Sequence, residues 1–287
     1  MKNSPTLGAW LQQARKIFAQ QSDTAGIEVQ VLAAHVLRRP RAWIAAHPET
    51  LLSDEQASHL NSLLARLLEG VPLPYITGKQ EFFGLDFEVT PAVLIPRPET
   101  ETLVEAALQW LKRFPERNRV ADVGTGSGCI AVSIAHYMPD VQILATDFSR
   151  EALKVAQRNV NRHGVSDRVQ LIQCDLLSAC AGTFDLVCAN LPYIPTSALD
   201  ETPPARFEPI AALHGGESGW EKIEALLQDA PRWLAPGGCI LLEIQWDQGH
   251  TVSEIARGIF PAAEIQILQD LAYLDRVVLI QTTSEKQ

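Results

Sequence analysis

Basic charge, paired cysteines and long apolar runs are all scarce in this chain of 287 residues. It carries 24 Lys and Arg against 34 Asp and Glu, a net charge of −10, so its overall charge gives no reason to bind nucleic acid. No window of the sequence approaches the roughly 18 apolar residues that a membrane span needs. The five cysteines form an odd set without a C-x-x-C pair, which favours a reducing compartment. We therefore expect a cytoplasmic protein with no membrane segment.

Several catalytic and ligand-binding motifs are also absent. The sequence contains no G-x-S-x-G and no G-x-x-x-x-G-K, which excludes the hydrolase elbow and the P-loop. Its seven histidines include no H-E-x-x-H and no other close ligand pair. We therefore expect no metal site.

The first quarter of the chain has helical periodicity. Ser53 and Gln56 have the spacing of a capping box, and Gly70 stands where the residue after a helix end is expected. Two apolar stripes recur at helical spacing: Leu7, Leu11, Ala14, Ile17 and Phe18, then Leu60, Leu63, Leu64, Leu67 and Leu68. Residues 1–95 hold 8 Lys or Arg and 9 Asp or Glu, so this region is not basic. We predict an N-terminal helical bundle over residues 1–74.

A connector separates this bundle from the rest of the chain. Residues 71–98 contain five prolines and two aromatic-rich extended pieces around Gly84, which predicts a β-hairpin within a linker over residues 75–96. Strands and helices then alternate over residues 97–287, which predicts right-handed crossovers and a mainly parallel, doubly wound sheet. Only LAYLD separates the last two strands, so they must pair antiparallel.

A glycine-rich turn, DVGTGSG at residues 122–128, follows the first strand of this sheet and opens a helix. Gly124, Gly126 and Gly128 allow backbone to approach a ligand at the helix N-terminus, which indicates a nucleotide-like ligand. The dinucleotide pattern G-x-G-x-x-G would need its third glycine at position 129, where the chain has Cys129. A nicotinamide enzyme is therefore disfavoured.

Acidic residues follow the next two strands. Asp147 ends the second strand, 19 residues after Gly128, where a carboxylate can accept both hydroxyls of a ribose. Asp175 ends the third strand, in position to meet an adenine edge. A glycine turn or an acid at a strand end is often purely structural. Here a glycine turn, two acids and then Asn-x-Pro-Tyr at residues 190–193 follow four successive strands and converge where open sheets bind ligands. The arrangement resembles the class I S-adenosylmethionine-dependent methyltransferases, which implies a Rossmann-like α/β fold, a seven-stranded sheet and S-adenosylmethionine as cofactor.

The fourth strand ends in Asn190, Leu191, Pro192 and Tyr193. Methyl transfer to a planar amide or aromatic amine requires acceptors that hold the two N–H groups and stabilise the charge that develops on nitrogen. The Asn190 side-chain oxygen and the Leu191 carbonyl could supply these acceptors, and Tyr193 could pack against the planar group. A strand-ending turn before proline is the structural alternative for an isolated motif of this kind.

Two substrate classes fit this motif: amino groups of nucleobases and the side-chain amide of glutamine. A methylase acting on duplex DNA must flip its target base and hold phosphates, which calls for a basic face that this sequence does not provide. An N6-adenine or other nucleic-acid amino-methyltransferase is the alternative function. A binding module that retains the cofactor fold without activity is another alternative, because the methyltransferases that this chain resembles have proline in this motif where it has Leu191.

Residues 70–101, with their IPRPETE element, and residues 206–219, RFEPIAALHGGESG, resemble the bacterial release-factor glutamine methyltransferases, the PrmC/HemK family. The family has proline where this chain has Leu191, and Gln245 and Tyr273 also depart from its pattern. The resemblance implies that the methyl acceptor is the glutamine N5 in the Gly-Gly-Gln loop of class 1 peptide-chain release factors.

By the same resemblance, a set of residues contacts the cofactor: Gly124, Thr125, Gly126, Ser127, Gly128, Asp147, Asp175, Leu176 and Asn190. Residues 190–193 would hold the glutamine. Arg97, between two prolines, would border the substrate entrance, or would be only a linker charge. The helical N-terminal domain would dock the release factor, with stabilisation of the enzyme as its alternative role. We expect a monomer that contacts no nucleic acid directly.

Overall fold

The computed structural model describes residues 5–199 and 206–283 and divides the chain into two compact units, residues 1–78 and 79–287. Residue 74, where we place the end of the helical domain, lies inside a short helix, Leu73–Thr77. The unit boundary follows that helix at Gly78, whose backbone is left-handed with φ of 71°.

The first unit consists of helices packed around one apolar core. Its helices are α1 (Leu7–Phe18), α2 (Ala25–Leu37), α3 (Arg41–Ala46), α4 (Asp54–Leu68) and α5 (Leu73–Thr77). Ser53 and Gln56 form the predicted capping box at the start of α4, and Gly70 follows its end with φ of 88°. On α1 the buried stripe contains Trp10 instead of the predicted Ile17, which is 44% exposed. The period is the same, and the stripe is rotated toward the larger side chain.

The predicted hairpin is present as β1 (Lys79–Phe82) and β2 (Leu85–Glu88) around Gly84. Buried Asn159 on α8 (Arg150–Arg162) accepts the Glu88 N–H at 2.7 Å and donates to the Ser127 carbonyl at 2.8 Å. One side chain therefore joins the hairpin to the glycine-rich turn.

The second unit is built on a seven-stranded sheet in the order β10-β11-β9-β6-β3-β4-β5. The strands are β3 (Arg119–Val123), β4 (Gln142–Asp147), β5 (Val169–Gln173), β6 (Phe184–Ala189), β9 (Leu234–Glu243), β10 (Glu264–Gln269) and β11 (Asp275–Gln281). β11 pairs antiparallel with both β10 and β9, as the short turn predicts, while the pairs among β9, β6, β3, β4 and β5 are parallel. The chain order reverses between β3 and β6, which makes that point the expected ligand crevice.

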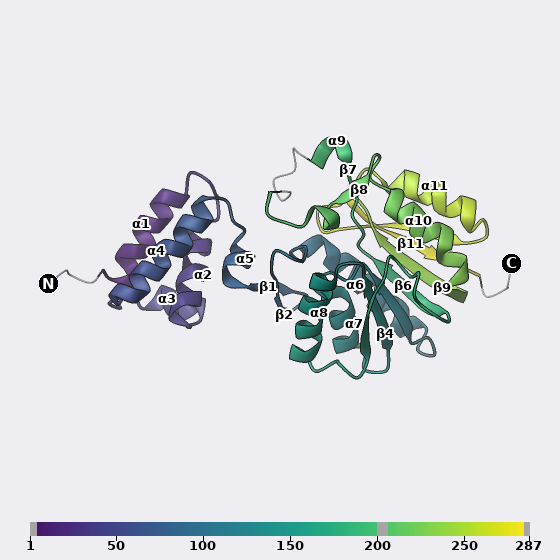
Figure 1. Ribbon diagram of the computed structural model, residues 1–287, viewed down its shortest axis with the longest axis horizontal. Coiled ribbons are helices and arrows are strands. Elements are labelled where there is room, and N and C mark those ends of the chain that lie inside the picture. Colours follow the sequence, from purple (N-terminus) through teal and green to yellow (C-terminus); the bar gives the residue numbers. More distant parts are fainter. Residues whose placement is uncertain (1–4, 200–205, 284–287) are drawn as a thin grey trace. The chain divides into compact units, whose positions relative to one another are not determined.

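Helices cover both faces of this sheet (Figure 1). One face packs against α6 (Glu101–Arg113), α7 (Cys129–Tyr137) and α8, and the other against α10 (Glu221–Asp229) and α11 (Gly249–Ile259). Successive strand residues alternate between the two cores, with Leu186 in the first and Val187 in the second. The remaining elements are short: η1 (Pro98–Thr100), β7 (Ile194–Pro195), α9 (Thr196–Leu199), η3 (Ile210–Ala212), β8 (His214–Gly216) and η4 (Ala230–Arg232).

Within the described part of the chain, none of the helices has both the length and the apolar composition that a membrane crossing requires.

Candidate functional site

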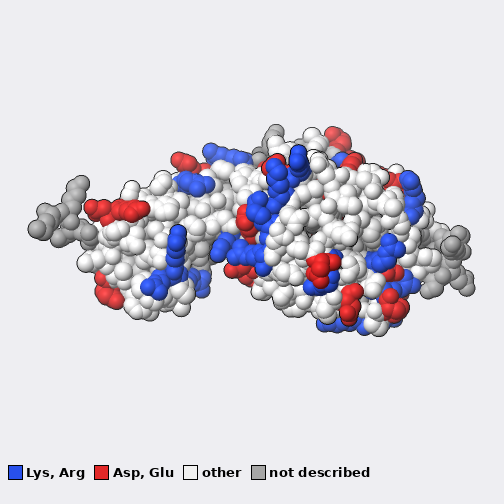
Figure 2. Space-filling model, turned by 60° about the horizontal axis from the view of Figure 1, so that its bottom comes forward, with Lys and Arg blue, Asp and Glu red and all other residues white. Residues whose placement is uncertain are grey.

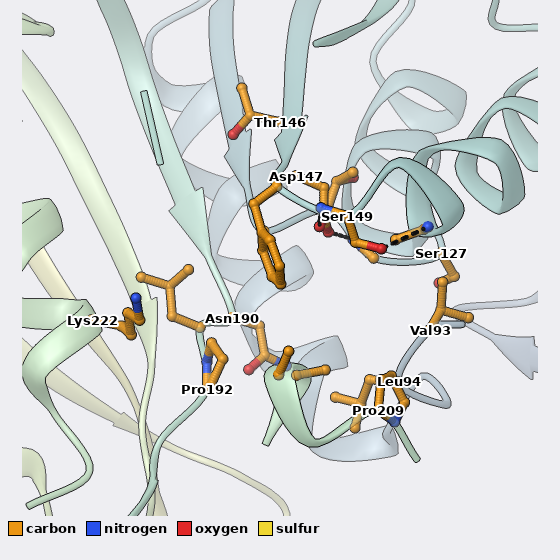
Figure 3. A pocket seen from close by; sticks show the side chains of 18 of the residues that line it. Val93, Leu94, Ser127, Thr146, Asp147, Ser149, Asn190, Pro192, Pro209 and Lys222 are labelled. Carbon is orange, nitrogen blue, oxygen red and sulfur yellow. Dashed lines mark hydrogen bonds between the residues drawn. The ribbon is translucent and has the colours of Figure 1, made fainter. Parts of the chain in front are cut away.

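A cavity of about 780 Å³ opens at the carboxyl edge of the parallel strands. Every residue that lines it belongs to the unit 79–287. Its volume lies in the range of small-molecule sites, about 300–1,000 Å³. In Figure 3, Asp147 and Ser149 lie on one side of the opening and Asn190, Pro192 and Lys222 on the other. The ends of β4 and β6 therefore face one another across the cavity.

The glycine-rich turn after β3 is held by hydrogen bonds to its neighbours. The N–H groups of Gly124 and Thr125 both donate to the Thr146 carbonyl, at 2.9 and 2.8 Å. Fully buried Asp122 accepts the Thr125 hydroxyl at 2.6 Å and the Ala131 N–H at 3.1 Å through Oδ2. Burial raises the pKa of Asp122 to about 6, and these two donors oppose that rise. Asp122 therefore fixes the turn to the first turn of α7.

Asp147 ends β4 and lines the cavity. Its Oδ2 accepts the Gly126 N–H at 2.9 Å, and its Oδ1 accepts the Ser149 N–H at 2.8 Å. Burial raises the pKa of this carboxyl, and the two backbone donors partly offset the rise. Each oxygen keeps lone-pair capacity for a further donor, which is what a ribose diol would require.

The third strand end is shorter than expected, because β5 stops at Gln173. Asp175 lies two residues beyond, exposed and lining the cavity. Leu176 beside it has a positive φ of 49°, which is uncommon for a branched residue. The Thr146 hydroxyl donates to the Leu176 carbonyl at 2.8 Å and holds this conformation.

Asn190 comes directly after β6 and lines the cavity. Its Nδ2 donates to Thr100 Oγ1 at 3.1 Å, which leaves Oδ1 to accept from a ligand. Buried Leu191 packs on the glycine turn, since a Cβ added to Gly124 would lie 3.0 Å from Leu191 Cδ2. Gln248 donates to the Tyr193 carbonyl at 3.0 Å and so ties the loop to the start of α11.

The cavity brings together most of the predicted site residues. Those that line it are Arg97, Gly124, Thr125, Gly126, Ser127, Asp147, Asp175, Leu176, Asn190, Leu191 and Pro192. Gly128 and Tyr193 are not among the lining residues. Gly128 serves packing, because a Cβ there would lie 3.3 Å from Ala156 Cβ on α8. Burial raises the pKa of the Tyr193 phenol, and the nearby Glu243 adds to that rise.

Arg97 lines the cavity and pairs with Glu208, whose side chain is almost fully buried. Glu208 also accepts the Ile95 N–H at 3.0 Å. The neighbouring Pro209 and Ile210 line the same cavity. The ion pair therefore fastens the connector before α6 to the segment that follows the Asn190 loop.

The sequence analysis missed many of the lining residues, among them Thr100, Thr146, Phe148 and Lys222. Phe148 could have been found, because it directly follows the strand-ending Asp147. Thr100, at the start of α6, belongs to the IPRPETE element and could also have been found from it. Lys222 lies near the start of α10 and carries no motif, so only the fold brings it to the cavity.

The cavity suits an adenosine-type cofactor. A Cβ added to Gly126 would meet nothing closer than 4.0 Å, so this part of the turn borders open space where a ligand can approach the backbone. Asp147 supplies acceptors on the same side, and Leu176 supplies an apolar surface. Polar groups on one wall and an apolar slot beside them match the chemistry of a ribose and a base.

Two further properties of the described residues concern metal binding and surface charge. Among residues 5–199 and 206–283, no three His, Cys, Asp or Glu side chains are grouped so that they could hold a metal ion. At the right of Figure 2, blue and red side chains lie close together on the face shown. Much of the remaining surface in that part of the picture is uncharged.

Comparison with known proteins gives consistent results. The family model described as "PrmC N-terminal domain" matches residues 9–78, and "Methyltransferase small domain" matches residues 100–207. A "Release factor glutamine methyltransferase" of Moorella thermoacetica is 42% identical, over 94% of this chain and 96% of its own. The protein of the same name from Escherichia coli is 40% identical, over 85% of this chain and 88% of its own. A crystal structure of a methyltransferase from Pyrococcus furiosus has a TM-score of 0.52 at 22% identity, over 78% of this chain and 99% of that one, and shares the fold.

Proposed function

The chain belongs to the release factor glutamine methyltransferase family, and we propose that it methylates the glutamine N5 in the Gly-Gly-Gln loop of a class 1 peptide-chain release factor, with S-adenosylmethionine as the methyl donor. The observation that carries this proposal is the orientation of Asn190. Its Nδ2 is engaged by Thr100 Oγ1 at 3.1 Å, so its Oδ1 is left as an acceptor at the wall of the cavity. An amide oxygen in that position suits a substrate N–H group.

Cofactor binding would fall to the side of the cavity formed by β3, β4 and β5. Asp147 would accept the ribose hydroxyls, the turn at residues 124–127 would lie along the methionine part, and Leu176 would face the adenine. When bound, the cofactor would supply a methyl group on a sulfonium, and the acceptor would attack the methyl carbon in line with the departing sulfur. Preformed backbone hydrogen bonds at Gly126 and Ser149 hold the Asp147 carboxylate before any ligand arrives.

The residues after β6 would hold the acceptor. In the transfer, the substrate nitrogen would form a bond to the methyl carbon as the sulfur–carbon bond breaks, and S-adenosylhomocysteine would leave while one N–H proton passes to solvent. The Asn190 Oδ1 and the Leu191 carbonyl would accept the two N–H groups, orient the nitrogen and stabilise the positive charge that develops there. Leu191 keeps a backbone carbonyl, so the change from the family proline preserves this acceptor.

The helical unit would then serve to dock the release factor. It has a core of its own and matches a family model over residues 9–78, so it is more than an extension of the sheet. Removing residues 1–78 should abolish transfer to intact release factor and leave cofactor affinity within about twofold, measured by calorimetry on the purified fragment. Undiminished transfer by a folded fragment would contradict the docking role.

The decisive test is transfer of labelled methyl from S-adenosylmethionine to an unmethylated release factor, with the product mapped by mass spectrometry. Label should appear on the glutamine of the Gly-Gly-Gln loop, and a release factor with alanine at that glutamine should remain unlabelled. An unmethylated cell extract, divided into protease-sensitive and nuclease-sensitive product, is the companion experiment. Label in nucleic acid would support the amino-methyltransferase alternative instead. A release factor substrate would place the enzyme in the cytoplasm. We also propose that the enzyme acts as a monomer.

A further inference from the structure

A buried carboxylate lies directly behind the acceptor side of the cavity. Glu243 ends β9 and is 1% exposed, and it is not among the cavity-lining residues. Neither of its side-chain oxygens has a hydrogen-bond partner among the described residues. An unpaired buried carboxylate is costly, so its position calls for an explanation.

The strand register places Glu243 beside Asn190. β6 and β9 are parallel, and Ala189 pairs with Leu242, so the next residue of each strand is Asn190 and Glu243. Thr100 lies near both, since it binds Asn190 Nδ2 and is the polar side chain that most lowers the pKa of Glu243. Thr100 and Asn190 line the cavity, and Glu243 lies beside both without lining it.

Thr100 and Asn190 together have two donor hydrogens that are free for Glu243, and Glu243 has two acceptor oxygens. Thr100 accepts from Asn190, so its own hydroxyl hydrogen is available, and Asn190 Nδ2 has a second N–H. The two Glu243 oxygens accept no hydrogen bond from the described residues. A carboxylate that accepts from both groups would exclude the flipped Asn190 amide, because the flip would turn an oxygen toward the negative charge.

We propose that ionised Glu243 is a positioning residue for the methyl-transfer reaction: it accepts from the Thr100 hydroxyl and from Asn190 Nδ2, and so keeps Asn190 Oδ1 directed at the acceptor nitrogen. This inference rests on the proposed function, because it concerns the same reaction. It adds a residue outside the cavity and a dependence on its ionisation.

The charged surroundings of Glu243 set the pH at which this arrangement forms. Burial raises its pKa to about 7; Thr100, Arg276 on β11 and Asn190 lower it, while Glu99 in η1 raises it. Tyr193 and Cys129 also lie near, and their pKa values are raised by burial with a further contribution from Glu243. The ionised fraction therefore increases through about pH 7, and kcat should rise with it.

Kinetics on the full-length enzyme test the proposal. Glu243→Gln and Thr100→Val should each lower kcat by about 10- to 100-fold, since each removes a charge-assisted hydrogen bond, and leave cofactor affinity within about twofold. Glu243→Gln should also remove the acidic limb of the kcat profile near pH 7. The double variant should be no slower than either single one, and Thr100→Ser should restore most of the rate. Ser253→Ala is the matched control, because the buried Ser253 hydroxyl also has no partner among the described residues. This substitution should leave kcat unchanged.

Several results would overturn it. A normal kcat and an unchanged pH profile in Glu243→Gln would do so, as would fully additive losses in the double variant. A parallel loss of cofactor affinity in Glu243→Gln would indicate collapse of the pocket rather than positioning.

A titration that needs no methyl acceptor separates this proposal from the proposed function. Carbon-13 NMR of the Glu243 carboxyl should give a pKa near 7 that rises further in Thr100→Val, because a donor to the ionised form is lost. An equal pKa in both proteins refutes the contact. If the native enzyme transfers no methyl to a release factor, the proposed function fails, and this titration still decides whether Glu243 and Thr100 interact.

Discussion

The two sides of the cavity differ in how their carboxylates are satisfied. On the cofactor side, both oxygens of Asp147 accept backbone N–H groups from turns beside it. On the acceptor side, neither oxygen of Glu243 has a partner in the described part of the chain. Both groups have a raised pKa because both are buried. The cofactor side is thus fixed by local backbone, while the acceptor side depends on side chains from three separate elements.

This difference indicates which parts of the site are preformed. Backbone donors come with the turn itself and cost little reorganisation when a ligand binds. Side-chain donors such as those of Thr100 and Asn190 must be aligned by tertiary packing. Changes on the cofactor side should therefore alter mainly binding, and changes on the acceptor side mainly turnover.

The largest effect should follow Asn190→Ala. It removes an acceptor used chiefly in the transition state, so kcat should fall by about 100- to 1,000-fold while cofactor affinity changes little. Steady-state methyl transfer and calorimetry measure the two quantities. Asn161→Ala, at an exposed asparagine on α8, is the control and should have no effect. Near-normal turnover by Asn190→Ala would show that Asn190 has no role in the reaction.

Next in size is the pH dependence of stability in Glu243→Gln. The pKa of Glu243 is raised by burial from 4.5 to about 7, so the native enzyme gives up stability as the pH rises through that interval. The neutral glutamine has no such dependence. The variant should therefore gain about 3 kcal/mol relative to the native enzyme between pH 4.5 and pH 8, by urea unfolding at each pH. A constant difference across this range would show that Glu243 is not buried in its charged form.

Asp147→Ala should produce a smaller effect of the opposite kind. Loss of charge-assisted hydrogen bonds to the cofactor should weaken its binding by about 10- to 100-fold, with kcat at saturating cofactor lowered much less. Titration calorimetry gives the affinity directly. Asp140→Ala removes an exposed carboxylate and should leave the affinity unchanged. A fall in kcat without a change in cofactor affinity would show that Asp147 acts in turnover and not in cofactor binding.

The smallest effect should come from Gly124→Ala, at the contact between the two sides. Gly124 has φ of 74°, so alanine costs about 1–2 kcal/mol in backbone energy, and its Cβ would also meet Leu191 Cδ2 at 3.0 Å. Gly164→Ala is the matched control, because Gly164 has φ of 65° and no described atom lies within 4 Å of a Cβ added there. Thermal unfolding should show similar losses, while only Gly124→Ala should lower both cofactor affinity and kcat. Equal kinetics in the two variants would mean that Leu191 does not link the sides.

Local sequence patterns were sufficient for the order of elements and for many of the residues that line the cavity. The capping box at Ser53, the hairpin around Gly84 and the antiparallel last strand all depend on residues close together in the chain. The glycine turn and Asp147 were found for the same reason, since each directly follows a recognisable strand. Asn190 was also found, because it ends a strand in a distinctive motif.

The tertiary structure decided the remaining features. It packed Gly128 against Ala156, and it brought Thr100 to Asn190 across 90 residues. It also placed Glu243 beside them through the register of β6 and β9, where its oxygens have no partner within residues 5–199 and 206–283. The sequence by itself determined which residues end each strand, because that depends on local periodicity. Which of those residues face one another depends on strand order and register, and these are set by packing of the whole sheet.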